Sequence, residues 1–324
     1  MREIKLGIVG ASGLVGKSML EVLENSDLSI SNLYLFTSKR SSGEVFHFRN
    51  SFYKFETLNE ASFNREIDYC LFATPSEISK IYVPAAIKKG IKVIDNSSYF
   101  RKTNPLIAYG VNDDEITNVD FLITNPNCCT IQSTLALAPI NKLFKLKKVF
   151  YTTFQATSGS GIKGILDLSS GRTDYYNRPI KNNLIPMIGK LNDNSLTDEE
   201  EKLISETKKI FNNDRLKVSA TCVRVSVLNG HSININITCE EEVDLEKLKQ
   251  FYNESKYYKY YEDDYPTPRE VSGSDLVHIA RLRYDFNSRK HISLFVVADN
   301  LRVGAATNAV RILSKLAKES RVDV

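Results

Sequence analysis

The chain has 324 residues, of which 42% are hydrophobic and 25% charged, and its formal net charge is +4. This length predicts about two domains with sizeable cores, and the composition excludes a disulfide-stapled module, a disordered chain and a fibrous protein. The charges are interspersed, so we expect no nucleic-acid partner. The N-terminus lacks the apolar core of a signal peptide, and no apolar run approaches the roughly 20 residues that span a membrane. We therefore expect a cytoplasmic protein without a membrane partner.

The cysteines are odd in number and irregularly spaced, at Cys70, Cys128, Cys129, Cys222 and Cys239. This pattern suits neither a disulfide framework nor a zinc site. We expect free thiols and no metal.

Short apolar runs alternate with segments of helical spacing over the first third of the chain. The runs lie at 6–9, 33–36, 69–73, 93–94 and 121–123, and the helical segments at 14–23 and 79–89. Continuous apolar strands between helices predict a parallel sheet that is covered on both faces.

The pattern changes after about residue 145. Longer strand-like segments lie at 149–156 and 217–227, residues 232–237 alternate strictly, and helices are expected at 198–211 and 244–253. Alternation indicates a half-exposed sheet, so we expect a second, largely antiparallel domain. An amphipathic helix at 304–318 could belong to either domain.

A glycine-rich turn, Gly7 to Gly16, joins the first predicted strand to the first predicted helix. Glycines at this junction let the backbone approach a pyrophosphate at the positive end of the helix. The second strand ends at residues 37–41, Thr-Ser-Lys-Arg-Ser, where an NAD enzyme usually has an acid. Cations and hydroxyls suit a 2′-phosphate, so we predict NADP. The alternatives are a turn without a ligand and a solvated basic loop.

Two adjacent cysteines, Cys128 and Cys129, lie between a strand and a helix that we expect to begin near Thr130. The positive end of a helix lowers the pKa of a thiol and makes it nucleophilic. Either cysteine could be the nucleophile, and the alternative is that both are buried and inert.

A nucleophilic thiol needs a proton-transfer partner, and the chain has four histidines. His231 is the best candidate because it follows a turn at the start of the alternating strand. Arg224 interrupts a run of β-branched residues seven positions earlier, which suggests a clamp for a carboxylate or phosphate. The acidic residues after Thr197 are explained largely by the chemistry of a helix start.

These features together resemble the aspartate-semialdehyde dehydrogenase family almost from end to end. The matching segments are 10–16, 38–41, 95–101, 125–130, 154–159, 224–231, 266–268 and 299–306. The Asn-Cys element and the spacing of seven between Arg224 and His231 are specific to this family. The resemblance implies reversible NADPH-dependent reductive dephosphorylation of L-aspartyl 4-phosphate to L-aspartate 4-semialdehyde, in the biosynthesis of lysine, methionine, threonine and diaminopimelate.

The resemblance also implies residue roles. Cys128 matches the nucleophile, His231 the acid/base and Gln155 the residue that orients the thioacyl intermediate. Arg224 matches the clamp on the substrate α-carboxylate, and Glu199 the partner of its amino group. The implied phosphate contacts are Arg101, Asn127 and Lys202. The implied cofactor-binding residues are Gly10, Ser12, Gly13, Leu14, Val15, Thr37, Ser38, Arg40, Ser41, Ser158, Gly159 and Asn300.

The implied fold is a Rossmann-like α/β NADP domain, residues 1–127 with 304–324, and an α+β catalytic and dimerisation domain, residues 128–303. The implied assembly is a homodimer or a tetramer. Two departures stand out, because Cys129 replaces a small hydroxyl residue and residues 73–76 replace the usual Ser-Ala-Gly type loop. N-acetyl-γ-glutamyl-phosphate reductase is the nearest alternative, and a non-catalytic relative is another.

Overall fold

The computed structural model describes residues 3–117 and 119–319 and divides into two compact units. One unit is Met1–Pro126 with Ala305–Val324, and the other is Asn127–Gly304. Each boundary differs by one residue from the expected one. Asn127 belongs to the second unit because its backbone and side chain hydrogen-bond Glu206 and Glu199 there. Gly304 belongs to it because a Cβ at this position would lie 2.7 Å from the Cβ of Cys128.

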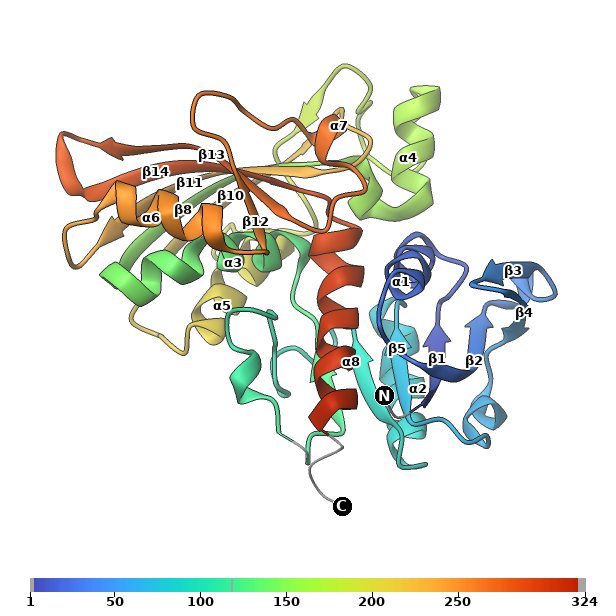
Figure 1. The fold of residues 1–324 in the computed structure, drawn as a ribbon. Helices are drawn as coiled ribbons and strands as arrows, with labels where there is room; N and C mark the ends of the chain where they lie inside the picture. Colours follow the sequence, from blue (N-terminus) through green and yellow to red (C-terminus); the bar gives the residue numbers. More distant parts are fainter. Residues whose placement is uncertain (1–2, 118, 320–324) are drawn as a thin grey trace. The chain divides into compact units, whose positions relative to one another are not determined.

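The first unit is a seven-stranded sheet in the order β3-β4-β2-β1-β5-β6-β7 (Figure 1). All neighbouring strands are parallel except the edge hairpin of β3 and β4. Its elements are β1 (Ile4–Val9), α1 (Leu14–Glu24), β2 (Ile30–Thr37), η1 (Lys39–Ser41), β3 (Val45–Phe48), β4 (Ser51–Thr57), η2 (Glu60–Phe63), β5 (Tyr69–Phe72), α2 (Ser76–Ile87), β6 (Lys92–Asp95), η3 (Asp113–Glu115), β7 (Leu122–Thr124) and α8 (Thr307–Glu319).

Both faces of this sheet are covered. Leu6 and Ile8 of β1 point to one face, in a core cluster with residues of α1 and α8, whereas Val9 points to the other, with Val83 of α2. Side chains alternate along a strand, so one β1 strand contributes to both cores. The prediction of a parallel sheet between two helical layers is therefore confirmed.

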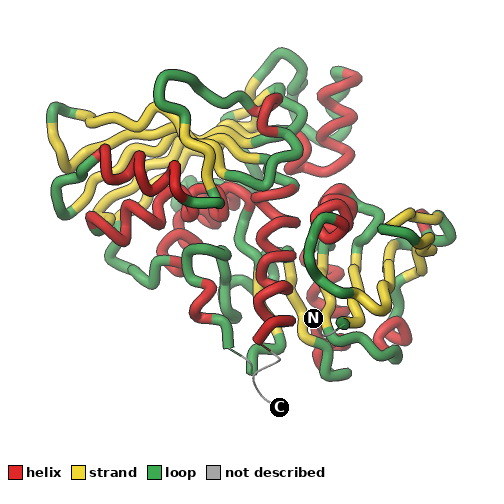
Figure 2. Tube along the Cα trace, viewed as in Figure 1, coloured by secondary structure: helices red, strands yellow, loops and turns green. Residues whose placement is uncertain are grey.

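The second unit is also built on a seven-stranded sheet, in the order β12-β13-β14-β11-β8-β10-β9. Figure 2 shows its strands in yellow and its helices in red. Its elements are α3 (Cys128–Phe144), β8 (Leu146–Gln155), η4 (Thr157–Ser160), α4 (Gly161–Ser170), β9 (Leu184–Ile185), α5 (Asp198–Ile210), β10 (Lys217–Val225), β11 (His231–Cys239), α6 (Leu245–Glu254), β12 (Tyr258–Tyr260), α7 (Pro268–Val271), β13 (Val277–Asp285) and β14 (Ser288–Ala298). A π-helical turn, Arg302–Ala306, leads out of this unit into α8.

Helices α3, α5 and α6 lie together on one face of this sheet (Figure 1). The sheet is more mixed than we expected, since β10 pairs with β8 and β12 with β13 in parallel, while the other pairs are antiparallel. The alternation at 232–237 predicts a half-exposed strand correctly but says nothing about the direction of its neighbours. The parallel pair matters for the site, because the carboxyl ends of β8 and β10 meet at one edge.

The long connection between α4 and α5 is fixed near both ends by aspartates. At its start, Asp167 accepts backbone N–H groups from Asp174, Tyr175 and Tyr176 at 2.9 to 3.1 Å. At its end, the Asp198 carboxylate accepts the N–H of Lys190 at 2.9 Å, and the Asp198 N–H donates to the Lys190 carbonyl. These hydrogen bonds fix both ends of a segment that is mostly irregular in between.

Candidate active site

The N-terminus of α3 carries the predicted nucleophile. The helix begins at Cys128, two residues before the expected start near Thr130, because Asn127 is its N-cap. The Asn127 Oδ1 atom accepts the N–H groups of Cys129 at 2.8 Å and Thr130 at 3.4 Å. This cap places Cys128 in the first turn, where the helix dipole favours a thiolate.

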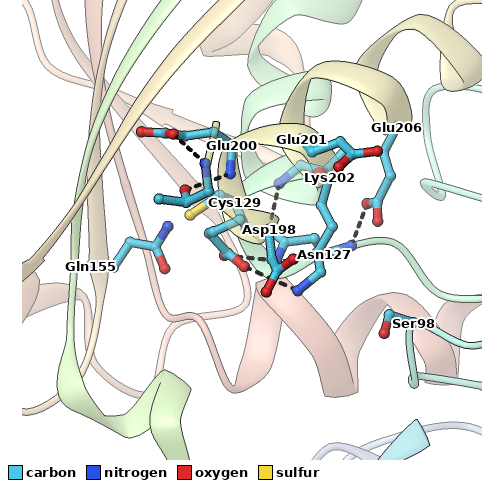
Figure 3. A network of polar contacts seen from close by, with 12 residues as sticks. Ser98, Asn127, Cys129, Gln155, Asp198, Glu200, Glu201, Lys202 and Glu206 are labelled. Atoms are coloured by element: carbon cyan, nitrogen blue, oxygen red, sulfur yellow. Dashed lines mark hydrogen bonds and ion pairs between the residues drawn. The ribbon is translucent and has the colours of Figure 1, made fainter. Parts of the chain in front are cut away.

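Helix α5 holds Asn127 from outside α3. The Asn127 backbone N–H donates to Glu206 Oε2 at 2.7 Å, and its Nδ2 donates to Glu199 Oε1 at 2.8 Å (Figure 3). Lys202 lies on the same helix with its Nζ 3.6 Å from Glu199 Oε2. Positions 199, 202 and 206 recur at three and four residues and so share one helix face. That face of α5 thus binds the residue before the nucleophile.

The Cys128 thiol is half-buried, and the Cys129 thiol and His231 are buried. One ligand atom from each of the three, the two Sγ atoms and a His231 ring nitrogen, all lie within 4.8 Å of one another. A hydrogen bond from the Cys129 thiol and the nearby His231 ring hold the pKa of Cys128 well below its ordinary value. Burial and the neighbouring Cys128 raise the pKa of Cys129. The opposite directions of the two pKa shifts favour Cys128 over Cys129 as the thiolate.

His231, Arg224 and Gln155 lie at the ends of neighbouring strands at one edge of the sheet. Gln155 is the last residue of β8, Arg224 is its register partner on β10, and His231 is the first residue of β11. The His231 Nδ1 accepts the N–H of Ala156 at 3.0 Å. The Arg224 Nη1 donates to the Ala156 carbonyl at 2.6 Å. Among the residues that the structure describes, the buried atoms Nε of Arg224 and Nε2 of His231 have no hydrogen-bond partner.

A glycine lets the backbone pack closely against these groups. A Cβ on Gly159 would lie 3.1 Å from Arg224 Nη1 and 3.3 Å from His231 Nε2. Buried polar atoms without partners are suited to a polar ligand. The buried Glu199 completes the charges here: burial raises its pKa, but Lys202, Asn127 and Arg224 outweigh burial and keep the pKa below its ordinary value.

The sulfur and nitrogen atoms of Cys128, Cys129 and His231 are close enough to be tested as a metal site. A metal on Nε2 of His231 would need that nitrogen to be unprotonated and Nδ1 to carry the proton. Nδ1 instead accepts the Ala156 N–H. The donor set therefore does not fit a metal bound through His231.

The glycine turn of the first unit has the geometry that a dinucleotide requires. Gly10 has φ +84°, and a Cβ on Gly16 would lie 2.2 Å from the Gly10 carbonyl oxygen. Gly13 is the N-cap of α1 and has no side chain to occupy the first N–H groups. A phosphate can approach such a helix end. Leu14 and Val15 form its first turn.

The end of β2 lies beside this turn. Ser12 and Thr37 hydrogen-bond through their hydroxyls, and Gly10 N–H donates to the Phe36 carbonyl at 2.9 Å. The 3₁₀ turn after Thr37 has Ser38 as its N-cap and contains Arg40 and Ser41, with Ser38 and Arg40 exposed. The cation and hydroxyls of this turn are of the types that suit a 2′-phosphate.

Three implied cofactor residues lie in the second unit instead. Ser158 and Asn300 are buried and hydrogen-bonded to each other, and Asn300 Oδ1 accepts the N–H of Gly230 at 2.9 Å. They support the turn before His231. Gly159 lies beside His231, as described above. Arg101, an implied phosphate contact, is in the first unit, where its Nη2 donates to the Asn96 carbonyl at 2.7 Å.

Comparison with known proteins decides the family. Residues 5–142 match the family model described as semialdehyde dehydrogenase, NAD binding domain, and residues 137–303 match semialdehyde dehydrogenase, dimerisation domain. The aspartate-semialdehyde dehydrogenase of Aquifex aeolicus is 36% identical over 98% of this chain and 99% of its own, and that of Campylobacter jejuni is 37% identical over 97% of each. The chain belongs to the aspartate-semialdehyde dehydrogenase family.

Solved structures agree. The crystal structure of aspartate semialdehyde dehydrogenase II from Vibrio cholerae, complexed with ASA, has a TM-score of 0.94 and 33% identity, and it covers 98% of this chain and 99% of its own. The Candida albicans enzyme with NADP, at 23% identity and a TM-score of 0.76, shares the fold. Aspartate-semialdehyde dehydrogenases are oxidoreductases that use a nicotinamide cofactor. N-acetyl-γ-glutamyl-phosphate reductase is not favoured by these comparisons.

Sequence reasoning missed two positions of this aspartate-semialdehyde dehydrogenase site. Glu206 is a buried carboxylate, and its spacing of seven from Glu199 could have shown that both share a helix face. The Ala156 peptide group had no sequence signal, because its contacts use only backbone atoms. In the part of the chain that the structure describes, no helix is long and apolar enough to cross a membrane.

Proposed function

We propose that this chain catalyses the reversible NADPH-dependent reductive dephosphorylation of L-aspartyl 4-phosphate to L-aspartate 4-semialdehyde and phosphate. The observation that carries the proposal is the placement of Cys128 in the first turn of α3, beside Cys129 and His231. A thiolate at this position can attack an acyl phosphate. The family relationship supplies the substrate class.

Cys128 performs the covalent chemistry. Its sulfur bonds to the acyl carbon, the bond from that carbon to the phosphate oxygen breaks, and phosphate leaves with the electron pair. NADPH, when bound, supplies the hydride that reduces the resulting thioester. His231 is the acid/base group for the acyl oxygen while that oxygen carries negative charge. When the carbon–sulfur bond breaks, the electrons return to the Cys128 sulfur and the aldehyde is released.

The charged groups recognise the two ends of the substrate. Arg224, with its buried Nε unpaired, is suited to the α-carboxylate, and Glu199 to the amino group. Gln155 orients the thioacyl group from the end of β8. The phosphate contacts that we propose are Asn127, Lys202 and Arg101. A free amino group needs an acid such as Glu199, whereas an acetylated substrate does not.

We also propose that NADP is preferred over NAD and that the chain acts as a homodimer. The exposed Arg40 at the end of β2 supports the first proposal, because a guanidinium suits a 2′-phosphate. The match of residues 137–303 to a dimerisation domain supports the second. Light scattering on the purified protein gives its mass in solution, and a tetramer or a monomer would replace the dimer.

The direct test of the reaction runs it in reverse. Purified protein is mixed with L-aspartate 4-semialdehyde, inorganic phosphate and NADP, and NADPH absorbance is followed, with N-acetyl-glutamate semialdehyde in parallel. We expect phosphate-dependent NADPH formation with the aspartate compound alone. Cys128→Ala should abolish it, whereas Cys129→Ala, which keeps the Cys128 sulfur, should largely retain it. Turnover of the acetylated compound alone would reassign the substrate, and absence of turnover with both would support a non-catalytic relative.

A further inference from the structure

The carboxylate of Glu199 is held through one of its two oxygens. Its Oε1 atom accepts the Nδ2 amide of Asn127 at 2.8 Å. Asn127 is itself fixed, because its N–H donates to Glu206 Oε2 at 2.7 Å and its Oδ1 caps α3. Both oxygens of an ionised carboxylate accept hydrogen bonds. The orientation of Glu199 is therefore set through Oε1, and Oε2 is the oxygen that can serve a ligand.

The second oxygen, Oε2, has a more distant partner. The Nζ atom of Lys202 lies 3.6 Å from it, which is within ion-pair range but too long for a hydrogen bond. The side chain of Lys202 is 36% exposed, whereas that of Glu199 is 11% exposed. A lysine side chain is a strongly hydrated charge on a flexible stem. Of the two residues, Lys202 is thus the one that can move.

Glu199 nevertheless needs a cation beside Oε2. Burial raises the pKa of Glu199, and Lys202 is the main group that brings this pKa below its ordinary value. Removing one partner of a buried ion pair is costly, because it leaves an uncompensated charge. This cost holds Lys202 next to Glu199 until another cation takes its place at Oε2.

We propose that the α-amino group of the substrate replaces Lys202 at Oε2 of Glu199, and that the released Lys202 then binds phosphate. This inference rests on the proposed function, which gives Glu199 the amino group and Lys202 the phosphate. It adds that the two contacts depend on each other. The substrate ammonium group compensates the buried carboxylate, and its charge repels the ammonium group of Lys202.

The exchange makes the site selective for an amino acid. A substrate without the amino group leaves Lys202 paired with Glu199, so phosphate lacks one cationic contact. Coupling between two ligands is reciprocal, and phosphate should therefore strengthen the binding of the semialdehyde by the same factor. Couplings of this kind typically amount to about 5- to 150-fold in affinity.

The coupling can be measured without turnover in Cys128→Ala, which lacks the nucleophile. Calorimetry gives the Kd of inorganic phosphate with no second ligand, with saturating L-aspartate 4-semialdehyde and with saturating succinate semialdehyde. Succinate semialdehyde has the same carbon chain but no amino group. We expect the aspartate compound to lower the Kd at least about fivefold, and the other compound to leave it within about twofold. An equal effect of both compounds, or a Kd that the aspartate compound does not lower, would overturn the proposal.

Substitutions on α5 separate the exchange from simple attraction between phosphate and the substrate ammonium. In the Cys128→Ala background, Lys202→Gln should abolish the coupling, whereas Lys208→Gln, in the last turn of the same helix, should retain it. Glu199→Gln should release Lys202 permanently and lower the Kd of phosphate without any semialdehyde. Adding Lys202→Gln to Glu199→Gln should remove this gain. Coupling that survives in Lys202→Gln, no gain in Glu199→Gln, or a gain that survives in the double variant would overturn the proposal.

Failure of the proposed function gives a different result from failure of the exchange. If neither phosphate nor the semialdehyde binds, the proposed substrates are wrong and this inference is overturned with them. If both bind but independently of each other, the proposed reaction stands and the exchange alone is overturned.

Discussion

Asn127 connects the nucleophile to α5, and its removal should destabilise the second unit measurably. In Asn127→Ala, α3 loses the cap that accepts the Cys129 N–H at 2.8 Å. Loss of a cap costs about 1 kcal/mol. The same change removes the amide that donates to the buried Glu199 at 2.8 Å, which costs about 1 to 3 kcal/mol. The free energy of unfolding should therefore fall by about 2 to 4 kcal/mol.

Urea unfolding followed by circular dichroism measures this change. Asn127→Ser is the matched control, since serine keeps a cap oxygen and lacks the amide donor, and it should lie between the two proteins. A loss below about 0.5 kcal/mol in Asn127→Ala would refute the reasoning, because neither bond would then contribute to stability.

Asn127→Asp separates the two bonds further, because it keeps the cap but places a carboxylate beside Glu199. Like charges raise the pKa of one of the two carboxyl groups in the folded state. A group whose folded pKa is raised contributes stability at low pH and loses it as the pH rises through that pKa. The difference in free energy of unfolding between the unmodified protein and Asn127→Asp should therefore be larger at pH 8 than at pH 5. An equal deficit at both values would contradict the contact with Glu199.

Three further predictions concern other parts of the chain. Cys129→Ala should raise the pKa of Cys128, because the thiol donor is lost, and so shift the pH midpoint of iodoacetamide alkylation upward; an unchanged midpoint would remove Cys129 from this role. Arg40→Ala should lower the ratio of kcat/KM for NADP to kcat/KM for NAD about tenfold or more. Lys89 is exposed, and Lys89→Ala is a control that should leave this ratio unchanged. Equal ratios in both variants would contradict a contact between Arg40 and the 2′-phosphate. Burial and Lys259 lower the pKa of His278 to about 4. The contribution of His278 to the free energy of unfolding should therefore be fully present above about pH 6.5 and fall by about 1 to 3 kcal/mol between pH 6.5 and pH 4. His278→Gln should flatten this part of a plot of unfolding free energy against pH, and a plot unchanged by that substitution would reject the assignment.

The two-domain fold could be predicted because its signals are local. Continuous apolar strands separated by helical spacing indicate a parallel sheet, and the glycine turn marks its first crossover. Strict alternation at 232–237 identifies β11. The direction of pairing is different in kind: β8 and β10 run parallel although more than 60 residues separate them. No local pattern encodes that choice.

The candidate site shows the same division. Cys128, Arg224 and His231 could be chosen from residue type and position. In the structure, Arg224 and His231 both hydrogen-bond Ala156, and the Cys128 sulfur lies near His231. The start of α3 was expected too late because the cap, Asn127, is itself held by contacts 72 and 79 residues away. Contacts of backbone atoms leave no trace in residue type, which is why the Ala156 peptide was not foreseen.

The two aspartate anchors of the connection between α4 and α5 bear on how this chain can vary in length. Asp167 closes its first turn on three N–H groups, and Asp198 closes its last on Lys190. Between these closures β9 pairs with β10 and Ile180 is buried, so the length can vary in the exposed stretches on either side of them, where lengthening a loop with fixed ends costs little free energy. In this family, insertions should therefore accumulate between the anchors, where they leave α5, and the glutamates it presents to Asn127, in place.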